Sequence, residues 1–326
     1  MNSMRQRYLN QIFMRIPRRA ENNDRGTLAA TYVNAGSFSA MLHSTDHQVL
    51  YGRRGTGKTH ALQHLSDLVE RTGDLSVYLD LRTIGSTDEG TYAGDTSTAG
   101  RGTHLLMDVL EAIHDELFAL AMEAESDLLE SLDALAEAAT AVQVVGEVER
   151  ETTIAGTKAS KFGFEISASA SANVTAADSR STSAQSRLRR TGVERHQIIF
   201  GPLNRALRGI SRILGPRRLW LLLDEWSSVP LDLQPLLADL LRRSILPVTK
   251  ITVKIATIER RSRFSTPTSN RDYIGIELGS DVATAVSLDD SMVFRHGSRE
   301  AEVFFEQLFY SHAQYMEGYA KSSLKK

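Results

Sequence analysis

The stretch QVLYGRRGTGKTHAL, residues 48–62, decides the fold of this chain. It begins with a short apolar run, which is typical of a buried strand, and continues with a glycine-rich turn and the start of a helical pattern. From Gly52 to Thr59 it matches the pattern G-x-x-x-x-G-K-[ST] in full, in the strand, turn and helix context that the pattern requires. The stretch therefore predicts a loop that holds the phosphates of a nucleotide.

The residue types in this loop suit phosphate binding. Gly52, Gly55 and Gly57 let the backbone curl so that successive N–H groups point at phosphate oxygens, and the helix that begins near Lys58 adds its positive end. We expect Lys58 to reach the outer phosphates and the Thr59 hydroxyl to hold Mg²⁺. The alternative is a glycine turn with an incidental lysine. The predicted nucleotide-binding residues are Gly52, Arg53, Arg54, Gly55, Thr56, Gly57, Lys58, Thr59 and His60.

A second stretch, RRLWLLLDEWSSVP (residues 217–230), contains an apolar run that ends at Asp224 and Glu225. A buried parallel strand delivers its last residues to the sheet edge where a phosphate loop also lies. We therefore assign Asp224 to Mg²⁺, through water, and Glu225 to orienting and deprotonating an attacking water. Strand-terminal acids are common, so this assignment depends on the loop. The chain has no Asn-Lys-x-Asp pattern of the kind that recognises guanine, so the expected cofactors are ATP and Mg²⁺.

Strand-like runs alternate with amphipathic stretches along most of the chain, which predicts an α/β fold with a parallel sheet covered by helices on both faces. The strand-like runs lie at residues 48–51, 75–80, 219–223 and 248–264, with a last extended region at 272–288. The helical stretches lie at residues 60–73, 103–122, 196–214, 235–246 and 299–316.

The middle of the chain, at about residues 123–195, is predicted to be an insertion. Residues 102–149 contain no lysine or arginine, and acids recur on a helical stretch through Ala139, which indicates a solvated acidic helix. Two alternating segments follow, at residues 142–154 and 162–174, with a small-residue turn between them, so we expect a β-hairpin. Such a hairpin could insert into a membrane. A hairpin laid on the domain or on a neighbouring subunit explains the same residues with fewer assumptions.

The composition of the 326 residues is that of a soluble globular protein, with 41% hydrophobic and 24% charged residues. A net charge of -2 argues against a surface that coats nucleic acid or an anionic membrane as a whole. There is no cysteine, no membrane-spanning apolar run and no secretory signal, so we expect a cytoplasmic protein. Residues 1–30 are Arg-rich and are predicted to be a basic arm, either a solvated tail or a partner contact, ahead of one domain at residues 31–326.

Three segments together resemble a known class of proteins. YGRRGTGKTHAL, LLLDEW and ITVKIATIE, in this order, are similar to the additional-strand P-loop ATPases of the AAA+ or STAND type, and most of all to the origin-recognition branch. The resemblance covers about residues 48–278. It implies a parallel sheet of order 5-1-4-3-2, ATP with Mg²⁺, and a homo-oligomer in which a neighbour's arginine completes the site. The sensor residue of that class would fall at Thr257 or Glu259, where the class usually has asparagine.

We expect the arginine that completes the site of a neighbouring copy to follow the fourth strand. Arg261 and Arg263, with Arg260, are the candidates, and Arg242 and Arg243 are weaker ones. Each could instead be solvated or paired with acids of its own chain. The chain departs from this class at its end, because KSSLKK leaves too little sequence for a full helical lid. Either the sequence is a fragment of a longer polypeptide or the lid is degenerate.

Other candidate sites are weaker. His43 and His47, like His60 and His64, have a spacing that could hold zinc on a helix, but no further ligand accompanies them. Asp80 and Arg82 could line the crevice or form an ordinary ion pair. Trp220 and Trp226 are expected to pack rather than to bind ligand.

Two functions remain open from the sequence. The first is an oligomeric ATPase that remodels or loads a macromolecular partner, with nucleic acid a possible one because of local basic stretches such as RLRRTGVER. The second is a slow nucleotide switch or scaffold of STAND type, for example in bacterial defence or signalling, which the insertion and the short end favour. A small-molecule kinase is disfavoured because no substrate lid is evident.

Overall fold

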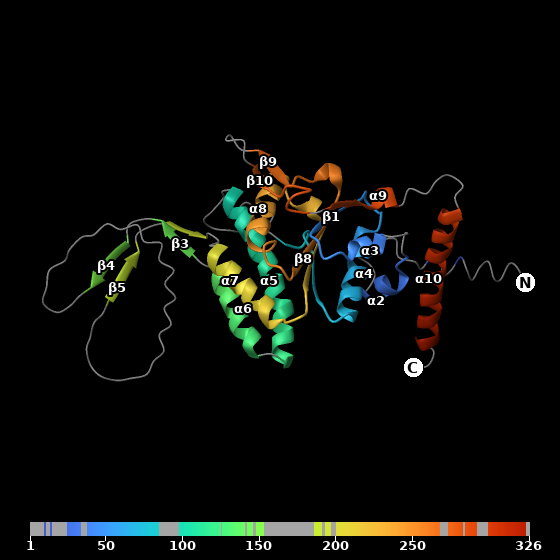
Figure 1. Ribbon diagram of the computed structural model, residues 1–326, viewed down its shortest axis with the longest axis horizontal. Helices are drawn as coiled ribbons and strands as arrows, with labels where there is room; N and C mark the ends of the chain where they lie inside the picture. The colour runs from blue at the N-terminus through green and yellow to red at the C-terminus, as the bar shows by residue number, and fades with distance from the viewer. Residues whose placement is uncertain are drawn as a thin grey trace, which may run out of the picture.

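The computed structural model describes most of the chain (Figure 1). The described residues are 25–33, 38–84, 98–124, 126–140, 142–145, 148–152, 186–190, 193–196, 200–267, 273–282, 284–291 and 299–323, with Asn10 and Met14. None of the helices in these ranges is both long enough and apolar enough to cross a membrane.

A five-stranded parallel sheet forms the centre of the protein. Its strands lie side by side in the order β11-β1-β8-β7-β2. If the five strands are numbered by their order in the sequence, the sheet runs from the fifth strand to the first, fourth, third and second. Because every pair is parallel, the carboxyl ends of all five strands lie at one edge. The predicted α/β fold with a parallel sheet is confirmed. The strands are β1 (Gln48–Tyr51), β2 (Leu75–Asp80), β7 (Leu219–Asp224), β8 (Ile251–Thr257) and β11 (Thr284–Ser287).

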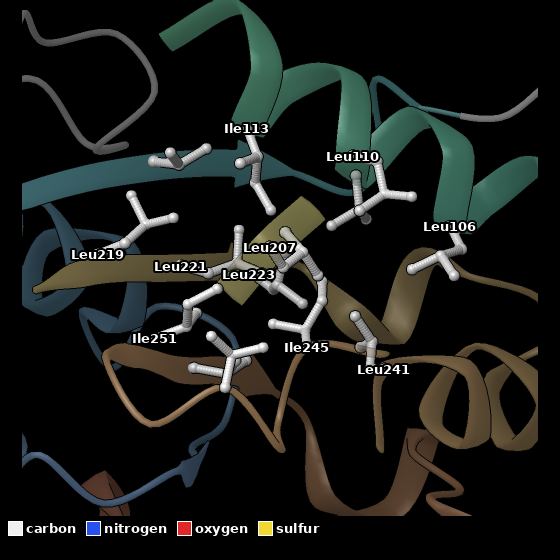
Figure 2. Packing of buried hydrophobic residues seen from close by; sticks show 14 of the residues in the cluster. Leu106, Leu110, Ile113, Leu207, Leu219, Leu221, Leu223, Leu241, Ile245 and Ile251 are labelled. Carbon is white, nitrogen blue, oxygen red and sulfur yellow. The ribbon is translucent and has the colours of Figure 1, made fainter. Parts of the chain in front are cut away.

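Helices cover both faces of the sheet, and the side chains of β7 alternate between the two layers. Leu219, Leu221 and Leu223 join one buried cluster, while Trp220 and Leu222 join the other. Each fully buried leucine stabilises the fold by about 1.5–3 kcal/mol. Figure 2 shows the first cluster, where Leu106, Leu110, Ile113, Leu207, Leu241 and Ile245 converge on Leu221 and Leu223.

The helices divide unequally between the faces (Figure 1). Helix α4 (Lys58–Arg71) packs on one face together with α3 (Phe38–Leu42) and α2 (Arg25–Thr31). On the other face lie α5 (Thr98–Ala124), α6 (Ser126–Ala139), α7 (Phe200–Ile213) and α8 (Gln234–Ser244). Outside the sheet, its covering helices and the insertion, the elements are η2 (Trp226–Ser228), η3 (Glu259–Arg261), β9 (Ser265–Pro267), β10 (Tyr273–Gly275), α9 (Leu288–Ser291) and α10 (Arg299–Ser323).

The insertion contains antiparallel ladders whose partners differ from the prediction. β3 (Val142–Val145) pairs with β6 (Val193–His196), and β4 (Val148–Thr152) pairs with β5 (Ser186–Arg190). The prediction that residues 142–154 pair with 162–174 was therefore wrong, because alternation marks a strand but does not identify its partner. The register instead sets Glu149 opposite Arg189 and Glu151 opposite Arg187. Residues 162–174 lie outside the described part of the chain.

Two predicted surface segments belong in part to the core. On α6 Glu130, Asp133 and Glu137 are exposed as expected, but three leucines are buried against the neighbouring helices, so the helix is amphipathic rather than simply solvated. These are Leu128, Leu132 and Leu135. Helix α2 lies across the predicted boundary at residue 30 and buries Leu28 beside α4. One leucine among small residues gives too weak a periodicity to show this in the sequence. The arginines of residues 1–19 lie outside the described residues.

Candidate active site

The loop between β1 and α4 has the backbone geometry that its glycines predict. Gly55 and Gly57 have φ values of 85° and 89°, in the left-handed region that side chains disfavour. A Cβ atom on Gly52 would lie 2.5 Å from the Thr56 hydroxyl oxygen, so this position accepts glycine alone without a shift. Gly57 directly precedes the 14-residue helix α4 and has no side chain with which to cap it. The first N–H groups of α4 therefore suit an anion.

Lys58 lies across this loop. Its Nζ donates to the carbonyl oxygens of Gly52 and Arg53, each at 3.0 Å, and the residue is buried. Burial lowers the pKa of Lys58, while the nearby carboxylates of Glu225 and Asp224 raise it. An ammonium group has three N–H donors, so these two bonds leave one for a further acceptor.

Asp224 ends β7 and is fully buried. Its Oδ2 accepts a hydrogen bond from the Tyr78 hydroxyl at 2.8 Å, and its Oδ1 accepts one from the backbone N–H of Glu225 at 2.8 Å. Burial, together with the Asp224 carboxylate, raises the pKa of Tyr78, so the phenol stays protonated as a donor. Tyr78 lies on β2, the strand next to β7, and was not singled out in the sequence.

Glu225 has the only positive φ among the described non-glycine residues, at 54°. Such a conformation costs of order 1–3 kcal/mol and persists only where the surroundings impose it. Here Trp226, fully buried and stacked on Phe264 at 5.2 Å between ring centroids, begins the next turn and anchors the chain. The turn holds Glu225 half-exposed at the end of β7.

The sheet sets the separation between the loop and the two acids. β8 lies between β1 and β7, so the carboxyl ends of β1 and β7 are two strand spacings, about 10 Å, apart. The first residue of the loop is tied to the intervening strand, because the Gly52 N–H donates to the Thr257 carbonyl at 3.2 Å. The Asp224 and Glu225 carboxylates are nevertheless near enough to Lys58 to raise its pKa.

A third acid, which sequence reasoning missed, contacts the loop. The Arg53 N–H donates to the Asp289 carboxylate, at 3.1 Å to Oδ2 and 3.3 Å to Oδ1. Asp289 lies on α9, directly after β11, and β11 pairs with β1. The sequence did show an acid directly after a strand. Only the strand order shows that this strand lies beside β1, which leads into the loop.

The predicted sensor positions are differently placed. The Thr257 hydroxyl is buried and bonded to the Ser262 hydroxyl, close to the end of β8. Glu259 lies exposed in the turn η3. Thr59 is half-buried in the first turn of α4, next to Lys58.

The candidate arginines fall into two groups. Arg260, Arg261 and Arg263 are exposed on and after η3, beyond the end of β8. The Arg242 guanidinium instead binds Asp239 of its own helix, with Nη2 and Oδ1 at 2.6 Å. Arg243 pairs with the same carboxylate at 3.6 Å and lies 4.3 Å from the centre of the Phe200 ring.

The His60 side chain, which was predicted to take part in nucleotide binding, contacts α2 and Tyr32. Its Nε2 lies 2.5 Å from the Leu28 carbonyl oxygen, and Tyr32 packs edge-on against its ring at 5.5 Å. The third residue of a helix faces a different side from the first, and here that side is covered by α2. The structure thus assigns His60 to packing.

The remaining candidates are structural. Within the described ranges no three His, Cys, Asp or Glu side chains gather as metal ligands, so the zinc hypothesis has no support there. The Arg82 Nη2 pairs with the Asp80 Oδ2 at 2.5 Å as an ordinary ion pair. Trp220 and Trp226 are buried, as expected of packing residues.

Comparisons with models of protein families, with curated proteins and with solved structures found no match for this chain. The geometry at the sheet edge is therefore the basis for any functional conclusion.

Proposed function

We propose that the protein is a P-loop ATPase of the additional-strand class that acts in the cytoplasm and couples its nucleotide state to assembly or remodelling of a macromolecular partner. The observation that carries the proposal is the meeting, at one sheet edge, of the Lys58 loop with the carboxylates of Asp224 and Glu225. The strand order β11-β1-β8-β7-β2 supports the additional-strand assignment, because β8 lies between the loop strand and the acidic strand.

The loop would bind the triphosphate through its backbone and through one lysine. The left-handed glycines and the start of α4 provide N–H groups, and the third N–H donor of Lys58 suits a phosphate oxygen. Exposed Arg53 and Arg54 add positive charge around the loop.

The donor set at this edge fits Mg²⁺. Asp224 offers a buried carboxylate in a fixed orientation, and Thr59 offers a hydroxyl from the first turn of α4. Oxygen ligands of this kind suit the ion, which when bound would neutralise charge on the phosphate oxygens. The Tyr78 hydroxyl would keep the Asp224 carboxylate oriented.

Hydrolysis would use Glu225 as the base. Its strained backbone fixes where the carboxylate leaves the strand, and its half-exposed position suits contact with a water molecule. Arg260, Arg261 and Arg263 are exposed, so one of them could reach the site of a neighbouring copy in a homo-oligomer. Arg242 and Arg243 are poor candidates because they are engaged with Asp239.

One observation favours the second candidate function, a slow nucleotide switch of STAND type. The resemblance expects an asparagine amide near the end of the fourth strand to help orient water. Here Thr257 has only a hydroxyl, and that hydroxyl is engaged with Ser262. A site with this substitution is expected to bind ATP well and to hydrolyse it slowly.

The test is ATP binding and hydrolysis by the purified protein over a range of protein concentrations, with and without DNA. Glu225→Gln should retain ATP binding and lose about 10²–10⁴-fold in turnover, the usual contribution of a general base. Glu302→Gln, an exposed change on α10, is the matched control.

The possible results separate the two functions. Turnover that rises with protein concentration supports an arginine donated by a neighbour, whereas tight binding with negligible turnover at every concentration supports the switch. No ATP binding, or turnover that Glu225→Gln leaves intact, would disprove the proposed site.

A further inference from the structure

The charges of α6 and α7 are segregated by sign. Helix α6 exposes Glu130, Asp133 and Glu137 and contains no basic residue. The sequence of α7, FGPLNRALRGISRI, contains no acidic residue, and the helix exposes three arginines. These are Arg205, Arg208 and Arg212.

On each helix the three charges form a stripe on the side opposite the core. Residues three and four apart lie on one side of a helix, and both sets have this spacing. On α7 the buried residues Leu203, Leu207 and Ile210 lie on the other side, as Leu128, Leu132 and Leu135 do on α6. We call the two sets the acidic stripe and the basic stripe.

The two stripes lie on neighbouring helices. The α6 and α7 helices pack against each other, and a Cβ atom on Gly209 of α7 would lie only 3.2 Å from the Ser131 hydroxyl oxygen of α6. In Figure 1 the two helices lie together on the side of the sheet away from α4. They thus form a two-helix surface with one negative and one positive half.

The charges on this surface have no partners within the described part of the chain. None of the six side chains forms an ion pair there, although helices of opposite sign lie side by side. Within each stripe, like charges three and four apart repel one another. A surface of opposite charge placed over both stripes would relieve this repulsion.

We propose that this surface binds the same surface of a second copy of the chain. A two-fold axis parallel to the stripes places the acidic stripe of each copy over the basic stripe of the other, so one surface complements itself. Each 14-residue helix is about 21 Å long and about 10 Å wide, which offers about 400 Å² per copy. This area is that of a weak, transient dimer whose association depends on salt.

The inference goes beyond the proposed function and does not depend on it, because no residue of the candidate active site takes part. Its test therefore needs no nucleotide. A failure to bind ATP would not contradict this dimer, and a failure to dimerise would not contradict the proposed ATP site.

The test uses two variants that reverse one stripe each. Arg205→Glu with Arg208→Glu makes both stripes mainly acidic, and Glu130→Arg with Asp133→Arg makes both mainly basic. We expect each variant alone to associate at least tenfold more weakly than the wild type, because like charges then face each other. An equal mixture of the two should associate about as well as the wild type. The measurement is mass in solution by sedimentation across protein concentration and at about 0.05 and 0.5 M salt.

The control is Glu302→Arg with Glu306→Arg, at exposed positions of α10. It makes the same charge change as Glu130→Arg with Asp133→Arg. It should associate as the wild type does. A wild type that stays monomeric at all concentrations, or a mixture that associates no better than the separate variants, would overturn the proposal. Duplex DNA bound by the wild type and lost on Arg205→Glu with Arg208→Glu, without a mixed complex, would assign the basic stripe to nucleic acid instead.

Discussion

Two buried lysines lie at different places on the same sheet, and they differ in what surrounds them. Lys58 lies at the carboxyl edge and contacts two loop carbonyls, with the carboxylates of Asp224 and Glu225 nearby. Lys254 lies in the middle of β8, opposite Gln48, which is the first residue of β1, and it is fully buried. Its Nζ donates to the carbonyls of Ser44 and Asp46, at 2.7 and 2.9 Å, and to the Gln48 side chain at 2.5 Å.

The difference is the one expected between a lysine that binds a ligand and one that only supports the fold. Lys58 has a donor left over, begins α4 directly after the glycine-rich loop, and lies near acids that suit a cation. Lys254 uses all three of its donors and also lies over the Trp220 ring at 5.4 Å. Burial alone therefore does not identify a functional lysine. What distinguishes Lys58 is the unused donor beside groups that could hold a ligand.

The largest expected effect is at Lys58. Lys58→Ala should lower ATP turnover by about 10²–10³-fold, because it removes a charge aimed at the phosphates. It should change the free energy of unfolding by less than about 1 kcal/mol, because the two loop carbonyls can bond to water instead. Steady-state kinetics and urea unfolding measure the two quantities. A large loss of stability with unchanged kinetics would mean that Lys58 is structural and would break the comparison.

The next effect is the pH dependence that Lys254 gives to stability. Burial lowers its pKa to about 7, whereas the unfolded chain has the ordinary value near 10.4. Between these values the unfolded state binds a proton that the folded state does not, so stability rises with pH from about 7 to about 10. The rise is on the order of 4 kcal/mol, since each pKa unit corresponds to about 1.4 kcal/mol. Lys254→Met should remove most of it and leave the smaller rise from Lys58, whose pKa burial also lowers, as urea unfolding at a series of pH values would show.

Two details keep that measurement clear. Burial raises the pKa of Tyr32 to about 12, so the tyrosine opposes the rise, but only above about pH 10. The matched control is Lys250→Met, which removes a partly buried lysine of the same region. If Lys254→Met and the wild type show the same rise, the alkaline stabilisation comes from other groups.

The smallest expected effect is at Tyr78. It tests whether the Asp224 carboxylate, one of the acids that distinguish Lys58 from Lys254, depends on the Tyr78 hydroxyl. Tyr78→Phe removes one hydrogen bond to Asp224 and should weaken Mg²⁺ affinity in the presence of ATP about tenfold, as loss of such a supporting contact commonly does. Turnover at saturating Mg²⁺ should change little. A titration of activity with Mg²⁺ measures this shift. An unchanged titration midpoint would show that Asp224 does not depend on Tyr78 for its orientation.

Prediction from the sequence worked where the information was local. The loop from Gly52 to Thr59 and the end of β7 at Asp224 were placed correctly, because a glycine turn and an apolar run specify their own conformation. The contact of His60 with α2, about 30 residues earlier in the chain, was not foreseen, because it depends on packing between distant segments. Tyr78 was missed because nothing in its neighbouring residues marks it. Asp289 was missed because an acid after a strand becomes informative only when the strand order is known.

The sequence by itself determined the phosphate-loop pattern, the alternation that makes a parallel sheet, and the acids that end β7. These depend on residues within a few positions of one another, so backbone preference and periodicity suffice. The tertiary structure decided which distant groups meet at the sheet edge, which lysine has a donor to spare, and which strands of the insertion pair. Those outcomes depend on strand order and on packing between segments far apart in the chain, which local preferences do not encode.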